Sequence, residues 1–120
     1  MFANFEFNPG TDFIPEYNLP QDYLAFMHQH NGGEGSVGKN AYMQLVPLEE
    51  LASFNKDYEI EKYLPNIILF GTDLGGTLFG YDTKKKMYAA IDACSMSKED
   101  VWYKGKTFNE FIAAVDHGDL

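Results

Sequence analysis

The sequence contains one cysteine, Cys94, and no arginine, and all of its apolar runs are short. A lone cysteine cannot form a disulfide within the chain. A membrane-spanning helix needs about 20 mostly apolar residues, and no segment approaches that length. The first residues, Met1 to Glu6, also lack the positive start and the continuous apolar stretch of a signal peptide. These absences predict a cytoplasmic protein.

The sequence also lacks the residue spacing of a metal site or a nucleotide-binding loop. His28 and His30 lie two apart on a predicted helix, so they point in different directions, and His117 has no evident partner. Leu69–Gly76 has neither the lysine of a Walker loop nor the helix-opening third glycine of a dinucleotide fingerprint. We therefore expect no metal and no cofactor.

A hydrolase that used Asp73 or Glu34 would be the enzymatic alternative. Such chemistry needs a cleft with a paired acid and base, and the sequence shows no such pair. Asp73 precedes Leu74-Gly75-Gly76, where ordinary turn chemistry lets an aspartate accept local backbone N–H groups. We therefore expect a protein that is not an enzyme and has no catalytic residues.

Negative charge is abundant and is concentrated in the first half of the chain. The formal net charge is −9, from eighteen acidic residues and nine lysines. Residues 1–60 carry nine Asp or Glu and two Lys, a net of −7, whereas residues 61–120 carry nine and seven, a net of −2. Such a surface repels nucleic acids and anionic membranes and accelerates encounter with a basic protein. The alternative is that the charge only keeps the protein soluble.

The length of 120 residues, 45% of them hydrophobic, suits one domain with a sizeable core.

A first helix is predicted from about Pro20 to His30. Tyr23, Phe26 and Met27 share one of its faces, and the glycines that follow Asn31 end it.

The rest of the chain is predicted to contain strands joined by hairpin turns and then a closing helix. Thr107 and Glu110 have the spacing of a capping box before the apolar stripe of that helix. The predicted ranges are an extended stretch at 35–38, a strand at 41–46, a helix from 47 or 48 to 54, a helical turn at 58–63, strands at 66–72, 77–82 and 87–92, an edge strand near 101–103 and a helix at 108–116. The predicted fold class is α+β: a single domain with an antiparallel β-sheet meander flanked by α-helices.

The start of the chain is predicted to be an extended arm. Phe5 and Phe7 alternate with polar neighbours as in a strand, and Pro9 and Pro15 then force bends. We expect the phenylalanines to pack this arm on the rest of the protein. The predicted division is an arm at residues 1–18 and an α+β domain at residues 19–120.

Several short motifs, weak singly, occur in an order that is fairly specific. They are Leu19–Met27 followed by Asn31-Gly32-Gly33-Glu34-Gly35, then Tyr42–Leu45, Leu48-Glu49-Glu50-Leu51, Leu69–Gly76, Phe79-Gly80-Tyr81-Asp82 and Thr107–Ile112. This combination resembles the SUKH superfamily, which includes the Smi/Knr cell-wall-synthesis regulators of fungi and many bacterial immunity proteins. The resemblance spans roughly residues 19–115. It departs from the family at the N-terminus, where members commonly carry a longer amphipathic helix.

The resemblance implies a sheet flanked by helices and a role in binding proteins. Aromatic anchors rimmed by carboxylates suit a basic protein surface, although an ordinary solvated face is the alternative. Glu34 is expected on a glycine-rich loop, where it either meets a partner's cation or accepts backbone N–H groups of that loop. The predicted partner-binding residues are Glu34, Tyr42, Glu49, Glu50, Asp57, Tyr58, Glu59, Glu61 and Asp73.

Two functions remain open at this stage. The first is an immunity protein that binds and neutralises a cognate basic toxin, such as a nuclease, through an acidic face. The second is a regulatory or scaffold module of the Smi/Knr type that binds endogenous proteins. The expected state is a monomer or a weak homodimer, and the expected partners include neither nucleic acid nor membrane.

Overall fold

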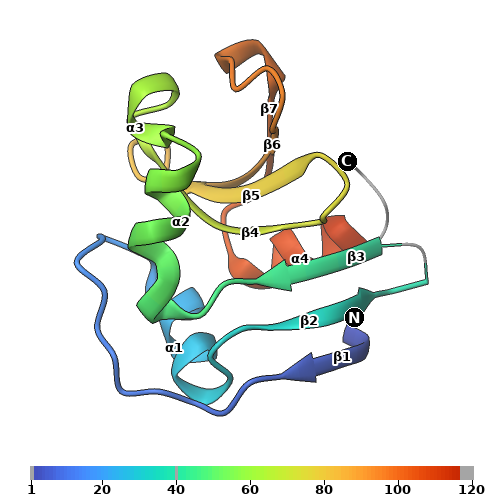
Figure 1. The fold of residues 1–120 in the computed structure, drawn as a ribbon. Helices are drawn as coiled ribbons and strands as arrows, with labels where there is room; N and C mark the ends of the chain where they lie inside the picture. Colours follow the sequence, from blue (N-terminus) through green and yellow to red (C-terminus); the bar gives the residue numbers. More distant parts are fainter. Residues whose placement is uncertain (1, 40, 117–120) are drawn as a thin grey trace.

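Seven strands lie side by side in the order in which they occur along the chain, each antiparallel to the next (Figure 1). The protein is described here by a computed structural model that covers residues 2–39 and 41–116, so His117 lies outside the described residues. The strands are β1 (Phe2–Phe7), β2 (Gly33–Val37), β3 (Ala41–Leu45), β4 (Ile67–Thr72), β5 (Thr77–Asp82), β6 (Met87–Asp92) and β7 (Val101–Gly105). The predicted antiparallel meander is confirmed, and β5 and β6 have the predicted bounds.

The helices occupy connections between the strands and the segment after the last strand. They are α1 (Gln21–Gln29), the 3-10 helix η1 (Leu48–Glu50), α2 (Leu51–Asp57), α3 (Ile60–Tyr63), the 3-10 helix η2 (Lys98–Asp100) and α4 (Phe108–Asp116). Helix α4 has the predicted bounds, and α1 is one residue shorter at each end than predicted. The α+β fold class is therefore confirmed.

The first six described residues form β1, one of the two edge strands of the sheet. Two glycines of β2 allow β1 to approach closely, because an added Cβ on Gly33 or Gly35 would lie 2.2 Å from a β1 carbonyl oxygen. Both glycines also have positive φ angles, 147° and 155°, which other residues rarely adopt. The predicted glycine-rich loop around Glu34 is therefore wrong, because Glu34 lies within a strand. The boundary between an arm at residues 1–18 and a domain at 19–120 stays a prediction.

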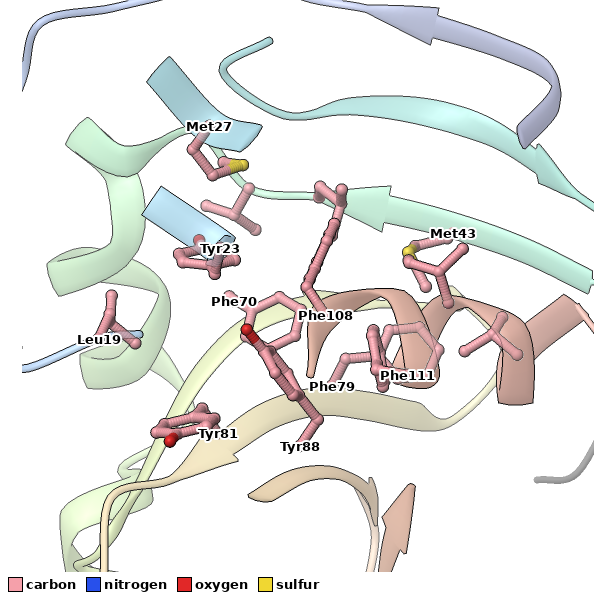
Figure 2. Close-up of a cluster of buried hydrophobic side chains, with 14 of the residues drawn as sticks. Leu19, Tyr23, Met27, Met43, Phe70, Phe79, Tyr81, Tyr88, Phe108 and Phe111 are labelled. Atoms are coloured by element: carbon pink, nitrogen blue, oxygen red, sulfur yellow. The ribbon is translucent and has the colours of Figure 1, made fainter. Parts of the chain in front are cut away.

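The main core lies between one face of the sheet and the helices α1 and α4. Figure 2 shows Tyr23 and Met27 of α1 and Phe108 and Phe111 of α4 pointing toward aromatic residues of the strands. Tyr88 of β6 stacks on Phe111, with 5.5 Å between the ring centroids. A smaller apolar cluster lies on the other face, where Ile60 of α3 joins buried residues of β4, β5 and β6. The remaining part of that face, on β1 to β3, is not covered in this way.

The predicted capping box at the start of α4 is confirmed. The backbone N–H of Glu110 donates to Thr107 Oγ1 (3.1 Å), and Glu110 Oε1 accepts from the backbone N–H groups of Thr107 (3.1 Å) and Lys106 (3.0 Å). Residues Phe108, Phe111, Ile112 and Val115 then form the predicted buried stripe.

Thr107→Ala is expected to lower the free energy of unfolding by about 1 kcal/mol, because it removes the hydroxyl oxygen that accepts from the backbone N–H of Glu110 in the first turn of α4. Thermal unfolding followed by circular dichroism measures the effect. Thr107→Ser keeps the hydroxyl and is the matched control. Equal losses in the two variants would show that the cap does not stabilise this helix.

Candidate partner-binding site

The uncovered face of β1, β2 and β3 carries acidic and polar side chains. Glu6 of β1 lies directly opposite Glu34 of β2, and Glu34 lies directly opposite Gln44 of β3. Residues that are paired in this way project from the same face of a sheet. Because side chains alternate along a strand, the neighbouring Gly33 and Leu45 face the core. Local strand geometry therefore places Glu6 and Glu34 side by side, away from α1 and α4.

Helix α2 forms a wall beside this face and encloses a cleft of about 560 Å³. Glu50, Ser53, Phe54 and Asp57 line the cleft from the helical side. Their spacing of three and four residues puts them on one face of the helical segment. Another side of the same segment lines a second cleft of about 840 Å³. Helix α2 is thus a ridge between two clefts.

Four carboxylates, those of Glu6, Glu34, Glu50 and Asp57, line the first cleft, and no lysine is among its described lining residues. We call it the acidic cleft. Like charges directly opposite one another in a sheet are destabilising by up to about 1 kcal/mol, as for Glu6 and Glu34. A cationic group that entered the cleft would relieve this repulsion. The arrangement therefore favours a basic ligand.

Two neighbouring side chains hold the Glu34 carboxylate in place. Tyr42 Oη donates to Glu34 Oε2 (2.5 Å), and Gln44 Nε2 donates to Glu34 Oε1 (3.1 Å). The hydrogen bond to Glu34 is the main cause that raises the pKa of Tyr42 above 10.0. A carboxylate has about four acceptor positions, so Glu34 can still bind a cation. Tyr42 itself is 42% exposed beside it, as an interface aromatic would be.

The predicted site residues are therefore only partly brought together. Glu34, Glu50 and Asp57 line the acidic cleft, and Tyr42 is bonded to Glu34. Glu59 and Glu61 line the second cleft together with Lys56 and Lys62, where the charges are mixed. Tyr58 is exposed and contacts the Phe54 ring, with 5.2 Å between the centroids.

Two other predicted site residues make structural hydrogen bonds. Glu49 accepts from Asn31 Nδ2 (2.7 Å) and Thr11 Oγ1 (3.1 Å), and so ties η1 to the segment before α1 and to the end of α1. Asp73 Oδ1 accepts from the backbone N–H groups of Gly75 (2.7 Å) and Thr77 (3.0 Å) in the turn between β4 and β5. This is the turn role that the sequence favoured for Asp73 over catalysis.

The sequence prediction missed Glu6 and Gln44 as parts of the acidic cleft. Glu6 lies between Phe5 and Phe7, and this alternation already placed it on the face opposite the phenylalanines. Its partner strand begins at Gly33, far away in sequence, so its neighbour Glu34 could not be inferred locally.

The stability of the protein is expected to fall as the pH drops below about 4.5. The hydrogen bond from Asn31 is the largest cause that lowers the pKa of Glu49 below 4.5, and the backbone N–H of Lys106 is the largest cause for Glu110. When folding lowers the pKa of a carboxyl group, its ionised form stabilises the folded protein at any pH above the pKa of the unfolded chain. That stabilisation is lost as the pH falls through the lower pKa of the folded protein. Urea unfolding at a series of pH values measures this. Glu49→Gln should flatten part of the dependence, and an unchanged profile would contradict this role of Glu49.

Across residues 2–39 and 41–116, no three or more His, Cys, Asp and Glu side chains gather in a way that could hold a metal ion. None of the helices in this part of the chain has the length and apolarity that crossing a bilayer requires.

The sequence model of the SMI1/KNR4 family (SUKH-1) matches residues 15–114, which is most of the chain. The chain belongs to this family. The match confirms the superfamily that the ordered motifs between Leu19 and Ile112 resembled. In this SUKH-1 domain, α2 and β3 of the acidic cleft lie inside the matched residues, whereas β1 and Glu6 precede them. A search of curated proteins gives no match to the chain.

Proposed function

We propose that this SUKH-1 protein is an immunity protein that neutralises a basic toxin by binding it in the acidic cleft. The observation that carries the proposal is the set of four carboxylates around one cleft without a lysine among its described lining residues. The SUKH superfamily, to which the family match assigns the chain, includes immunity proteins. We expect the protein to act in the cytoplasm as a monomer or a weak homodimer.

The proposed mechanism is occupancy and not catalysis. A nuclease attracts phosphates with a positively charged cleft, and the same charge would steer it toward an acidic surface. Once it is docked, the exposed Tyr42 and the half-buried Phe54 offer ring surface beside Glu34 and Asp57. Aromatic groups at the centre of an interface commonly carry most of the binding energy. Covering the toxin's active site is then sufficient for neutralisation.

The direct test is co-purification with the protein encoded in the adjacent reading frame, followed by an assay of that protein's toxicity. We expect a stable complex and loss of toxicity when both are expressed together. Toxicity that persists while a complex with an endogenous basic protein forms would favour the regulatory module of the Smi/Knr type instead.

The electrostatic part of the proposal predicts a steep dependence of association rate on salt. Exposed charges are screened beyond about 8 Å at physiological ionic strength, so added salt should slow association much more than it speeds dissociation. Stopped-flow mixing at several salt concentrations measures both rates. An association rate that does not change with salt would contradict steering by the acidic cleft.

A further inference from the structure

Within residues 2–39 and 41–116, no other strand covers the outer edge of β1. It is the first strand in the sheet order, and Figure 1 shows it as the lowest strand, with β2 on its upper side only. The backbone of Asn8 donates to Gly32 O (2.9 Å), and the carbonyl oxygens of Glu6 and Asn4 lie against the glycines of β2. Backbone groups alternate in direction along a strand, so those of Phe5 and Phe7 point to the uncovered edge.

The two faces of β1 have opposite chemistry at this edge. Glu6 projects into the acidic cleft, where it lies opposite Glu34. On the other face, Phe7 remains 39% exposed while its ring contacts Phe2, Phe5, Phe26 and His30, with centroids 4.7 to 6.0 Å apart. A segment lying along β1 would therefore meet the Glu6 carboxylate on one face and aromatic rings on the other.

We propose that the partner adds an extended segment to the free edge of β1, as an additional strand with alternating basic and apolar side chains. Its backbone would pair with the outward N–H and C=O groups of Phe5 and Phe7. Its basic side chains would lie beside Glu6, with Glu34 one strand further from the edge, and its apolar ones beside Phe7. This inference rests on the proposed function, since it specifies how the same basic partner is held.

Charge complementarity selects this occupant over a second copy of the chain. Edge pairing of two β1 strands would bring the Glu6 carboxylates of both copies close together on the same face of the joined sheet, where their like charges repel. Each copy also carries a formal net charge of −9, which opposes association. A basic strand would instead be attracted both by Glu6 and by the net negative charge of the protein.

The test uses two capped peptides, one that alternates lysine and valine and one with the same residues arranged as a lysine block and a valine block. Both carry the same charge, but only the first presents basic and apolar side chains on opposite faces of a strand. Isothermal titration measures affinity, and amide hydrogen exchange by NMR measures protection of the Phe5 and Phe7 N–H groups. Two variants are compared: Phe7→Pro removes the outward N–H, and Phe7→Ala keeps it.

We expect the alternating peptide to bind more tightly than the block peptide and to slow exchange at Phe5 and Phe7. Phe7→Pro should weaken the alternating peptide about three- to tenfold relative to Phe7→Ala, because one hydrogen bond is lost, and should leave the block peptide unaffected. Glu6→Gln combined with Glu34→Gln should weaken both peptides.

Equal affinity of the proline and alanine variants, without protection of Phe5 and Phe7 in the native chain, would overturn strand addition. In that case, a loss of affinity for both peptides in the glutamine variants would still support the acidic cleft as the binding site of a basic partner. Failure of both peptides to bind, or binding that the glutamine changes do not affect, would instead count against the proposed function itself. If Phe7→Pro does not fold, as judged by circular dichroism, the protection of the Phe5 and Phe7 amides in the native chain decides the question.

Discussion

Replacing Asn55 by alanine is expected to lower the free energy of unfolding by about 3–4 kcal/mol. Asn55 is a polar residue of α2 that is only 6% exposed. Its Nδ2 donates to Leu51 O (2.8 Å) and Leu69 O (2.9 Å), and its Oδ1 accepts from Leu69 N–H (2.7 Å). The side chain thus acts toward Leu69 as a neighbouring strand residue would.

The size of this effect follows from the way β3 and β4 meet. They pair at only two positions, Gln44 with Thr72 and Leu45 with Gly71, and β4 has an irregular register between Leu69 and Gly71. The backbone of Leu69 is therefore satisfied by Asn55 and not by a strand. Alanine would leave a buried N–H and two buried carbonyls with fewer partners, and each unsatisfied group costs about 1–3 kcal/mol.

Urea unfolding monitored by circular dichroism measures this change. Lys56→Ala is the matched control, because Lys56 is the exposed neighbour on the same helix and its loss should change stability by less than about 0.5 kcal/mol. A loss below about 1 kcal/mol for Asn55→Ala would show that the helix does not depend on this amide for its position on β4.

Reversing two charges in the acidic cleft should weaken binding of the basic partner about 100-fold. Glu34→Lys together with Asp57→Lys replaces attraction by repulsion at two walls of the cleft, and like-charge contacts across an interface cost several kcal/mol. The affinity is measured by titration with the co-purified partner or, failing that, with the lysine–valine peptide.

The control for this charge reversal is Glu59→Lys together with Glu61→Lys. These residues line the second cleft, so the net charge changes by the same amount while the acidic cleft keeps its carboxylates. We expect less than about a threefold loss of affinity, since these exposed side chains line the other cleft and make no direct contact with a ligand in the acidic cleft. Equal losses in the two double variants would show that net charge, and not this cleft, selects the partner.

The middle and the end of the chain were predictable because their signals are local. Strands β5 and β6 are bounded by turn residues, and α4 has both a capping box and an apolar stripe. The predicted helix after Pro47 ends three residues later than expected, at Asp57, because η1 leads into α2 and Asn55 anchors that helix to β4.

The acidic cleft was only partly predictable because three separate elements build it. Glu34 and Asp57 were selected for their charge, but Glu6 comes from a strand whose pairing partner lies beyond α1. Glu49 had the same charge and a neighbouring position, and its hydrogen bonds to Asn31 and Thr11 could be seen only in three dimensions. The acidic residues alone predicted a basic partner. The sheet topology, which is not local in sequence, determines which of these carboxylates share one cleft.

The position of α4 at the end of the fold has a consequence for synthesis of the protein. Phe108, Phe111 and Val115 complete a core that already includes Leu19 and Tyr23 from the early part of the chain. Until α4 leaves the ribosome, the rings of α1 and of the central strands lack the packing partners that α4 supplies, and exposed apolar surface of this kind promotes aggregation. Nascent chains stalled before Phe108 should therefore require chaperone protection that the released protein no longer needs.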